Sequence, residues 1–340
     1  MPSRGSASGR VRSRDSARNV NIMTTIPTHT PVLLEETLHY LAVKPGGSYI
    51  DCTTGLGGHS ARIAEAMGPD GRLLCIDQDR EALELARTKL SANGRRISFV
   101  HGNFRDVASL AAREGFEGVD GILMDLGISS MQIGRAERGF AFGLDGPLDM
   151  RMNQEDGEIT ASEIVNTWDE TSLADLFYRY GEERQSRRIA AAVVKARPVE
   201  TTWELARAVE QAVGGARGRT QIHPATRVFL ALRIRVNGEL DSLDAALPQA
   251  HSLLGFGPQP EDGGRLVVIS FHSLEDRMVK QYLRREAADC ICPPGLPECR
   301  CGHRATLKDL TRRAIRPGEQ EIAANPRARS AVLRAAQRIR

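Results

Sequence analysis

Short apolar runs alternate with helix-like patterns over the first third of the chain. Runs of strand length, rich in aliphatic residues, occupy residues 48–52, 72–77, 97–101 and 119–125. Apolar residues recur at helical spacing in 31–41, 59–67 and 81–91, as on one face of an amphipathic helix. Strands and helices in this order predict an α/β fold with a doubly wound parallel sheet.

The alternation stops after the fourth strand, and helical patterns fill the next block. Residues 134–151 are rich in Gly, Arg and Asp and predict a loop, whereas residues from about 160 to 250 show helical patterns only. We expect Ser172 and Thr202 to be the N-caps of two of these helices. A strand pattern returns at 264–271, so the helical block is expected to interrupt the sheet.

The composition is that of a folded globular protein. The chain has 340 residues, of which 41% are hydrophobic and 26% charged, and this excludes collagen-like and wholly disordered chains. No apolar run approaches the ~20 residues that span a bilayer. The basic N-terminus is not followed by the apolar segment of a secretory signal. We therefore expect a cytoplasmic protein without a membrane segment.

The net charge of +3 hides a split along the chain. Residues 1–28 carry a net charge of +4, residues 29–276 carry −10 and residues 277–340 carry +9. Basic ends on an acidic body favour a polyanionic partner, the alternative being ends that are merely solvated. Eight C-terminal arginines are candidates for phosphate contacts: Arg312, Arg313, Arg316, Arg327, Arg329, Arg334, Arg338 and Arg340. The N-terminal tail has too few large apolar side chains to fold, and Met23 offers a second translation start.

A glycine-rich loop with Gly55, Gly57 and Gly58 separates the first predicted strand from the next helix. Glycines let backbone N–H groups approach a ligand, and the following helix turns its positive end towards the loop. Asp77 ends the second strand, 22 residues after Gly55, a spacing at which an acid accepts ribose hydroxyls. The pattern predicts a nucleoside-containing cofactor; the alternative is a glycine-rich turn that binds nothing.

Two cofactors compete for this loop. A dinucleotide fingerprint requires a third glycine or alanine where this chain has Ser60. Asp51, just before the loop, favours an aminoacyl ligand, because an ammonium group needs a carboxylate. S-adenosylmethionine combines an aminoacyl group with a ribose, and we expect it in preference to NAD. Asp125 and His272 also end predicted strands, so we expect them beside Asp77 at the sheet edge where ligands bind.

Nine motifs occur in order between residues 29 and 333 of the chain. They are HTPVLL (29–34), GGHS (57–60), DLGISS (125–130), ERGF (137–140), DGPLDMRM (145–152), YGEER (180–184), HPATR (223–227), SFHSLEDR (270–277) and NPRARS (325–330). In these motifs the chain closely resembles the RsmH (MraW) family of bacterial methyltransferases, which act on a cytosine N4 of small-subunit rRNA. The match covers nearly the whole chain apart from the N-terminal tail.

The resemblance implies a Rossmann-like S-adenosylmethionine-dependent methyltransferase sheet with an inserted all-helical domain. It implies a cytidine in the decoding region of 16S rRNA as substrate, in free rRNA or in the small ribosomal subunit. The cofactor contacts that it implies are Gly57, Gly58, His59, Asp77, Phe104, Asp125 and Gln132. The segments that we expect are a disordered basic tail (1–28), a first methyltransferase part (29–150), a helical insertion for substrate recognition (151–245), a second methyltransferase part (246–290) and a cysteine-containing loop with a basic C-terminal segment (291–340).

Cytosine N4 is a poor nucleophile, and it needs acceptors that hold its protons while the nitrogen rehybridises. DNA amino-methyltransferases usually supply them from a loop with two prolines and an aromatic residue, where this chain has DLGISS. Candidate acceptors are Asp125, Ser129, Asp149 and His272, with Asp125 as the expected catalytic residue. Phe140 and Phe142 either receive the unstacked base or fasten the helical block to the sheet.

The six cysteines fall into two sets. Cys52 and Cys75 lie in strand-like contexts and are expected to be buried free thiols. The other four lie within 12 residues: Cys290, Cys292, Cys299 and Cys301. A tetrahedral zinc site is chemically reasonable for them, with His303 as a substitute ligand; the alternative is a reduced or redox-labile loop. We assign no metal to the predicted active site.

Three functions are weighed from the sequence. The leading one is an RNA methyltransferase, and the second is a non-catalytic rRNA-binding factor of ribosome assembly. Asp77, Asp125 and the intact loop favour the enzyme, because a pure binder need not keep them. The third, a nicotinamide oxidoreductase, is disfavoured by Ser60 at the third glycine position.

Overall fold

Seven strands form one sheet in the order β3-β2-β1-β4-β5-β7-β6. The computed structural model describes residues 31–91, 94–155, 159–214, 223–257, 259, 262–293 and 298–340, so the predicted tail (1–28) and Met23 lie outside the described residues. The strands are β1 (Ser48–Asp51), β2 (Arg72–Asp77), β3 (Arg96–His101), β4 (Gly121–Asp125), β5 (Arg265–Ser270), β6 (Leu307–Asp309) and β7 (Val332–Arg338).

The parallel part of the sheet confirms the expected doubly wound arrangement. β1 to β5 pair in parallel, and the strand order reverses between β1 and β4. Ligands bind beyond such a switch point in open α/β sheets. β7 pairs antiparallel with both β5 and β6. The segment 291–340, expected to be a cysteine-containing loop and a basic C-terminal segment, therefore also contributes β6 and β7 to the sheet.

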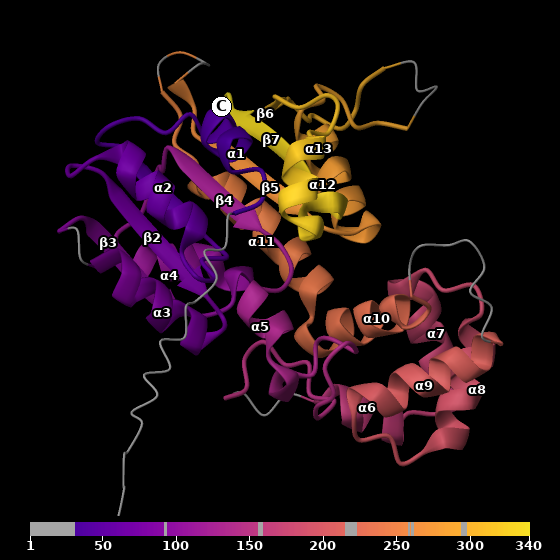
Figure 1. Cartoon of the computed structure of the whole chain (residues 1–340). Coiled ribbons are helices and arrows are strands. Elements are labelled where there is room, and N and C mark those ends of the chain that lie inside the picture. Colours follow the sequence, from indigo (N-terminus) through magenta and orange to yellow (C-terminus); the bar gives the residue numbers. More distant parts are fainter. Residues whose placement is uncertain are drawn as a thin grey trace, which may run out of the picture.

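Helices cover both faces of the sheet (Figure 1). One face is covered by α1 (Leu34–Leu41), α2 (Gly58–Met67) and α3 (Arg80–Leu90), and the other by α4 (Val107–Arg113), α11 (Glu239–Leu253) and α12 (Ser273–Glu286). Strand side chains alternate between the two cores: Leu73 of β2 packs into the first and Leu74 into the second, as the period of a strand requires. Cys52 and Cys75 are buried free thiols, as predicted.

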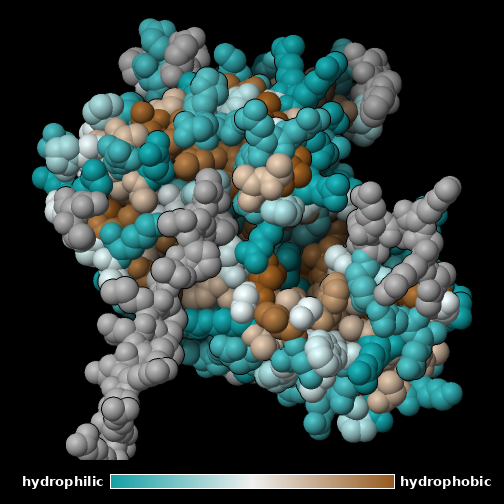
Figure 2. Space-filling view, viewed as in Figure 1, coloured by the Kyte–Doolittle hydropathy of each residue, from teal (hydrophilic) through white to brown (hydrophobic). Residues whose placement is uncertain are grey.

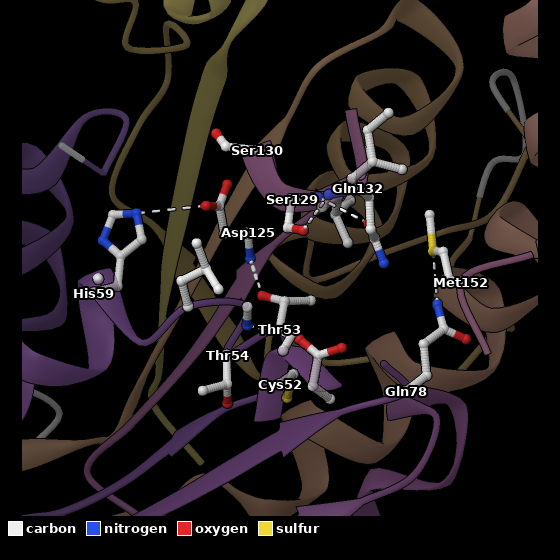
Figure 3. Close-up of a pocket in the computed structure, with 18 of the residues that line it drawn as sticks. Cys52, Thr53, Thr54, His59, Gln78, Asp125, Ser129, Ser130, Gln132 and Met152 are labelled. Atoms are coloured by element: carbon white, nitrogen blue, oxygen red, sulfur yellow. Dashed lines mark hydrogen bonds and ion pairs between the residues drawn. The ribbon is translucent and has the colours of Figure 1, made fainter. Parts of the chain in front are cut away.

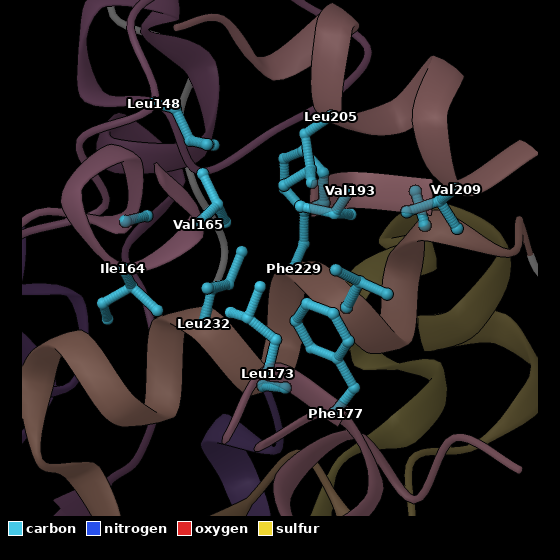
Figure 4. Packing of buried hydrophobic residues seen from close by; sticks show 14 of the residues in the cluster. Leu148, Ile164, Val165, Leu173, Phe177, Val193, Leu205, Val209, Phe229 and Leu232 are labelled. Atoms are coloured by element: carbon cyan, nitrogen blue, oxygen red, sulfur yellow. The ribbon is translucent and has the colours of Figure 1, made fainter. Parts of the chain in front are cut away.

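A second group of helices has its own hydrophobic core (Figures 1 and 4). These are α6 (Ala161–Thr167), α7 (Glu170–Gly181), α8 (Ser186–Ala196), α9 (Thr202–Val213) and α10 (Ala225–Asn237). Leu173, Phe177, Val193 and Phe229 meet at its centre. The sequence-predicted helical insertion is thus a packed unit. None of the helices in the described ranges is long and apolar enough to cross a membrane.

The helical insertion and the sheet are joined by α10 and α11. α10 ends at Asn237, and its C-cap Gly238 adopts φ 57°, a conformation that glycine takes without strain. Leu243 and Leu247 of α11 then pack into a core of the sheet. The predicted boundary at residue 245 falls inside α11, whereas the packing changes at Gly238.

Two predicted helix caps are off by a few residues. α7 is capped by Asp169, whose side chain accepts a hydrogen bond from Ser172 N, so Ser172 lies inside the first turn. α9 is capped by Thr201 rather than Thr202, because Glu204 three residues later completes a capping box with Thr201.

Candidate active site

One cavity of about 760 Å³ lies at the carboxyl ends of β1, β2, β4 and β5. Its lining continues onto the α10–α11 junction, with Arg233, Asn237 and Glu239. In the space-filling view the molecule is hollowed between its sheet part and its helical part (Figure 2). The volume is within the range of cofactor and small-ligand pockets, and the two units of the fold share its walls.

The loop after β1 follows its path because of its glycines. Gly57 adopts φ 72°, and a Cβ atom there would lie 3.2 Å from Ala86 Cβ of α3. A Cβ atom at Gly58 would lie 2.6 Å from Pro31 Cγ. Gly58 lines the cavity, whereas Gly57 holds the loop against α3. Of the two predicted contact glycines, only Gly58 therefore faces the cavity.

Asp51 does not face the cavity, contrary to the expectation that it receives an ammonium group. Its side chain is 1% exposed and accepts hydrogen bonds from Ser60 Oγ (2.5 Å) and Thr53 N (3.1 Å). Burial raises the pKa of this carboxyl, and the hydrogen bond from Ser60 opposes the rise. Asp51 therefore stabilises the loop through these hydrogen bonds, from the interior side. The prediction that Asp51 ends a strand is confirmed, but its side chain points into the protein interior and not into the cavity.

Asp77 lies at the end of β2 and lines the cavity. Its two carboxylate oxygens accept hydrogen bonds from Gly55 N (2.6 Å) and Asp79 N (2.8 Å). Burial raises the pKa of Asp77 to about 7, although these N–H donors favour the charged form. A carboxylate oxygen has more than one lone pair, so Asp77 retains capacity for hydroxyl donors in the cavity.

Asp125 and His59 lie next to each other in the cavity lining (Figure 3). Asp125 Oδ2 lies 3.5 Å from His59 Nε2, and Asp125 N donates to Thr53 Oγ1 at 2.6 Å. Asp125 Oδ1 and both ring nitrogens of His59 are buried without a hydrogen-bond partner in the described part of the chain. Buried polar atoms are normally paired, so this part of the cavity suits a polar ligand.

Phe104 and Gln132 also line the cavity, in different ways. Phe104 starts the short helix η2 (Phe104–Asp106) after β3 and is half-buried, so part of its ring is open to a ligand. Gln132, in α5 (Ser130–Gly134), donates from Nε2 to Asp79 Oδ2 at 2.7 Å and accepts from Ser129 N at 2.9 Å. Both ends of the Gln132 amide are therefore engaged within the protein.

A buried ion pair between Asp79 and Arg138 supports this wall, and sequence reasoning missed it. Arg138 Nη1 lies 2.8 Å from Asp79 Oδ2, and each side chain is 4% exposed. Arg138 also donates to the carbonyl of Met152 at 2.8 Å, while Asp79 caps α3. The pair thereby ties the end of β2 to the segment that leads into the helical insertion. Its sequence signals were a cap position at Asp79 and the ERGF motif.

Charged side chains fill the boundary between cavity and helical insertion. Arg233 makes a bidentate pair with Glu239, at 2.8 and 2.9 Å. Glu275 is buried, accepts from Phe271 N at 2.8 Å, and lies 3.1 Å from His272 Nε2. The pKa of Glu275 is lowered by His272 and Arg233 in spite of its burial. His272 thus caps α12 and pairs with Glu275.

Of the other residues predicted to contact the substrate base, some line the cavity and others are engaged elsewhere in the protein. Ser129 lines the cavity, whereas Asp149 does not and instead holds Arg151 with both oxygens. Phe140 is buried in the core of the helical insertion, and the Phe142 ring stacks on His223 at 4.5 Å between centroids. These contacts favour the fastening role of the two phenylalanines over base reception.

The predicted C-terminal arginines also divide into two groups. Arg334 is buried in a bidentate pair with Asp276, and Arg338 donates to backbone carbonyls including Ser252 O at 2.9 Å. These two stabilise β7 and are not free to contact phosphate. The remaining six are exposed: Arg312, Arg313, Arg316, Arg327, Arg329 and Arg340. Arg327 stands at the cavity itself.

Comparisons with known proteins find relatives over most of the chain. The family described as "MraW methylase family" matches residues 27–339. A protein of Thermomicrobium roseum named "Ribosomal RNA small subunit methyltransferase H" is 55% identical over 315 residues, 92% of this chain and 94% of that protein. One of the same name from Dehalococcoides mccartyi is 53% identical over 311 residues, 92% of this chain and 86% of its own length. The crystal structure of TrmN from Thermus thermophilus is similar with a TM-score of 0.40 and 13% identity, over 90% of this chain and 48% of that one.

Proposed function

Because the chain belongs to the MraW methylase family, we propose that it transfers a methyl group from S-adenosylmethionine to an RNA of the small ribosomal subunit. One observation carries this proposal: relatives named as small-subunit rRNA methyltransferases are 53% and 55% identical over 92% of the chain. The finer proposal is that the acceptor is the exocyclic N4 of a cytidine in the decoding region of 16S rRNA, as the family resemblance implies.

The lining residues fit S-adenosylmethionine. Asp77 offers carboxylate lone pairs to ribose hydroxyls, and Phe104 offers part of a ring face to adenine. The unpartnered ring nitrogens of His59 suit the charged methionine end of the donor, and Asp125 bounds the space beside them. Gly58 and Gln132 bound the same space, whereas Gly57 acts on loop shape. When bound, S-adenosylmethionine supplies a methyl group on a positively charged sulfur.

The task of the protein is then to make N4 nucleophilic and to accept its proton. We assign that role to Asp125, because Oδ1 is buried without a partner and the residue lines the cavity. A hydrogen bond from the amino group to this oxygen favours a tetrahedral nitrogen with a free lone pair. Ser129 is the second acceptor available at this wall.

The substrate surface that we propose runs from the cavity over Arg316, Arg327 and Arg329, which lie near the start of β7. Arg340 follows the other end of β7, which pairs with the start of β5, and is not part of this surface. Arg327 marks the point where the exposed arginines reach the cavity. Phosphate contacts from this surface position the RNA, while the cavity selects the base. The helical insertion forms the opposite wall through Arg233 and Asn237. A ribosomal substrate is expected to be met in the cytoplasm.

Methyl transfer in vitro tests the proposal. Purified protein is incubated with isotope-labelled S-adenosylmethionine and with small subunits, free 16S rRNA or large subunits, and the RNA is then digested to nucleosides. We expect label only in small-subunit RNA and only as N4-methylcytidine. Asp125→Asn should lower the rate of labelling by about a hundredfold or more, while Asp70→Asn, at an exposed position, should leave it unchanged. Tight rRNA binding without transfer would favour the assembly factor instead.

A further inference from the structure

The loop between α12 and β6 brings four thiols together that the proposed function does not use. The sulfur atoms of Cys290, Cys292, Cys299 and Cys301 all lie within 4.8 Å of one another. Cys299 Sγ and Cys301 Sγ are 3.6 Å apart, and Cys290 Sγ and Cys301 Sγ are 3.9 Å apart. All four cysteines are free thiols.

These separations match a tetrathiolate site. With zinc–sulfur bonds of about 2.3 Å, the corners of a tetrahedron are about 3.8 Å apart. The two measured sulfur–sulfur distances fall on either side of that value. Disulfide-bonded sulfur atoms are only about 2.0 Å apart, so the arrangement is that of ligands around a common centre.

Backbone donors point at the sulfur atoms in a reciprocal pattern. Ile291 N, in the middle of the first C-x-C pair, donates to Cys301 Sγ of the second at 3.4 Å. Arg300 N, in the middle of the second pair, donates to Cys292 Sγ of the first at 3.4 Å. Hydrogen bonds of this kind orient metal ligands and stabilise the charge on a thiolate. The two pairs therefore form one unit, not two independent turns.

The loop has no hydrophobic core to hold this arrangement. Among the described residues of 287–306 none is buried, and Ile291 is 46% exposed. Hydrogen bonds fasten its base, among them those from Thr306 N to Glu286 O at 2.8 Å, from Ala305 N to Asp289 Oδ1 at 3.2 Å and between His303 Nε2 and Arg285 O at 2.9 Å. A segment without a core needs another source of folding free energy, and a structural metal supplies it.

We propose that Cys290, Cys292, Cys299 and Cys301 bind one structural Zn²⁺ ion in a tetrahedral S₄ site. Soft thiolate ligands in this geometry select zinc over hard cations. Four protein ligands leave no open position, so the ion has a structural role and not a catalytic one. His303 is not needed as a ligand, because its Nε2 is engaged at the base of the loop. The ion would fix the exposed Arg300, which lies between Cys299 and Cys301.

Elemental analysis of the full chain, purified under reducing conditions without a His-tag, tests the proposal. We expect about one equivalent of zinc per chain. The variant Cys290→Ser/Cys301→Ser should lose at least about nine-tenths of it, while Ile291→Ser, in the same loop, should keep it. Neither readout depends on methyl transfer, so failure here leaves the proposed function untouched.

A second measurement identifies the ligands independently of how well the serine variant folds. Parent protein reconstituted with Co²⁺ should show thiolate-to-metal charge transfer and the visible bands of a tetrahedral ion. Less than about a tenth of an equivalent after reconstitution with Zn²⁺ would overturn the proposal. Iron in place of zinc, intact disulfides, or zinc retained by the double-serine variant and therefore bound elsewhere would also overturn it.

Discussion

At the residue scale, the cavity contains two carboxylates, Asp77 and Asp125, whose hydrogen-bond partners differ. Asp77 is held by two backbone donors at the end of β2, whereas Asp125 has one oxygen without a partner at the end of β4. A satisfied carboxylate suits ground-state binding of a hydroxyl. An unpartnered one suits an acceptor whose interaction is strongest during reaction. We therefore expect the two side chains to affect different constants.

Replacing Asp77 by Ala should weaken donor binding. Each hydrogen bond to a charged group contributes about 1.5–3 kcal/mol, which corresponds to a roughly ten- to hundredfold higher Kd for S-adenosylmethionine. Isothermal titration calorimetry measures the Kd, with Asp70→Ala as the control, because Asp70 is exposed in the turn before β2, at the end of the strand opposite Asp77. An unchanged Kd in a folded Asp77→Ala variant would remove Asp77 from the donor site.

The raised pKa of Asp77 predicts a pH dependence of donor binding. Hydroxyl groups donate to the charged carboxylate, and the pKa is about 7 in the free protein. Affinity should therefore be full above pH 7 and fall as pH drops below it, by up to about tenfold in Kd per unit. Asp77→Asn should show a flatter profile. The same slope in both proteins would assign the titration to another group.

Asp125→Asn should lower turnover at saturating donor by about a hundredfold or more. The donor Kd should change much less, because the amide keeps the size of the side chain. Single-turnover kinetics on small subunits separates the two effects. Near parental turnover would exclude Asp125 as the proton acceptor and direct attention to Ser129, the other candidate that lines the cavity.

Residue types at strand ends were predictable, but side-chain directions were not. The sequence placed Asp51, Asp77 and Asp125 at strand ends, and all three are there. Only the last two line the cavity, because Ser60 and Thr53 draw the Asp51 carboxylate into the interior. That outcome depends on a hydroxyl nine residues away, which no strand pattern encodes.

At the element scale, the Asp79–Arg138 pair links β2 to the segment entering the helical insertion. Replacing Arg138 by Met leaves a buried carboxylate without its partner, which should cost about 3–5 kcal/mol of unfolding free energy. Arg80 pairs with Glu155 on the surface, with both side chains about half exposed. Arg80→Met should cost less than about 1 kcal/mol. Urea denaturation compares the variants, and equal losses would contradict the linking role.

Regular elements with strong patterns were predictable, and the C-terminal strands were not. β7 reads Val-Leu-Arg-Ala-Ala-Gln-Arg, a mixed sequence without strict alternation. It is nevertheless buried between β5 and β6, because Asp276 pairs with Arg334 and Gly263 O accepts from Gln337. Its polar residues are hydrogen-bonded to partners distant in the sequence, so a local pattern could not reveal a strand that is paired on both sides.

At the scale of the whole molecule, the cavity exists only because two units meet. Its lining joins the loop after β1 to Arg233 and Glu239 on either side of Gly238. The sequence predicted an insertion in an α/β sheet, and that is confirmed. It did not predict that the α10–α11 junction closes the cavity, since that depends on how the two cores pack.

Residues 1–22 should be dispensable for methyl transfer. They lie outside the described residues and contain few large apolar side chains, so they add little to a folded core. A chain that starts at Met23 should methylate small subunits at the parental rate. Loss of activity in a truncated protein that still binds S-adenosylmethionine would instead make the arginine-rich tail part of the RNA contact.

The most direct test of the central claim is nucleoside mass spectrometry of rRNA from cells in which this gene is the sole member of its family. Small-subunit rRNA should contain an N4-methylcytidine in the decoding region when the gene is present. The modification should be absent when the gene is deleted, and strongly reduced when the gene encodes Asp125→Asn at an equal protein level. A methyl group that persists after deletion, or that maps to another base or to large-subunit rRNA, would contradict the account.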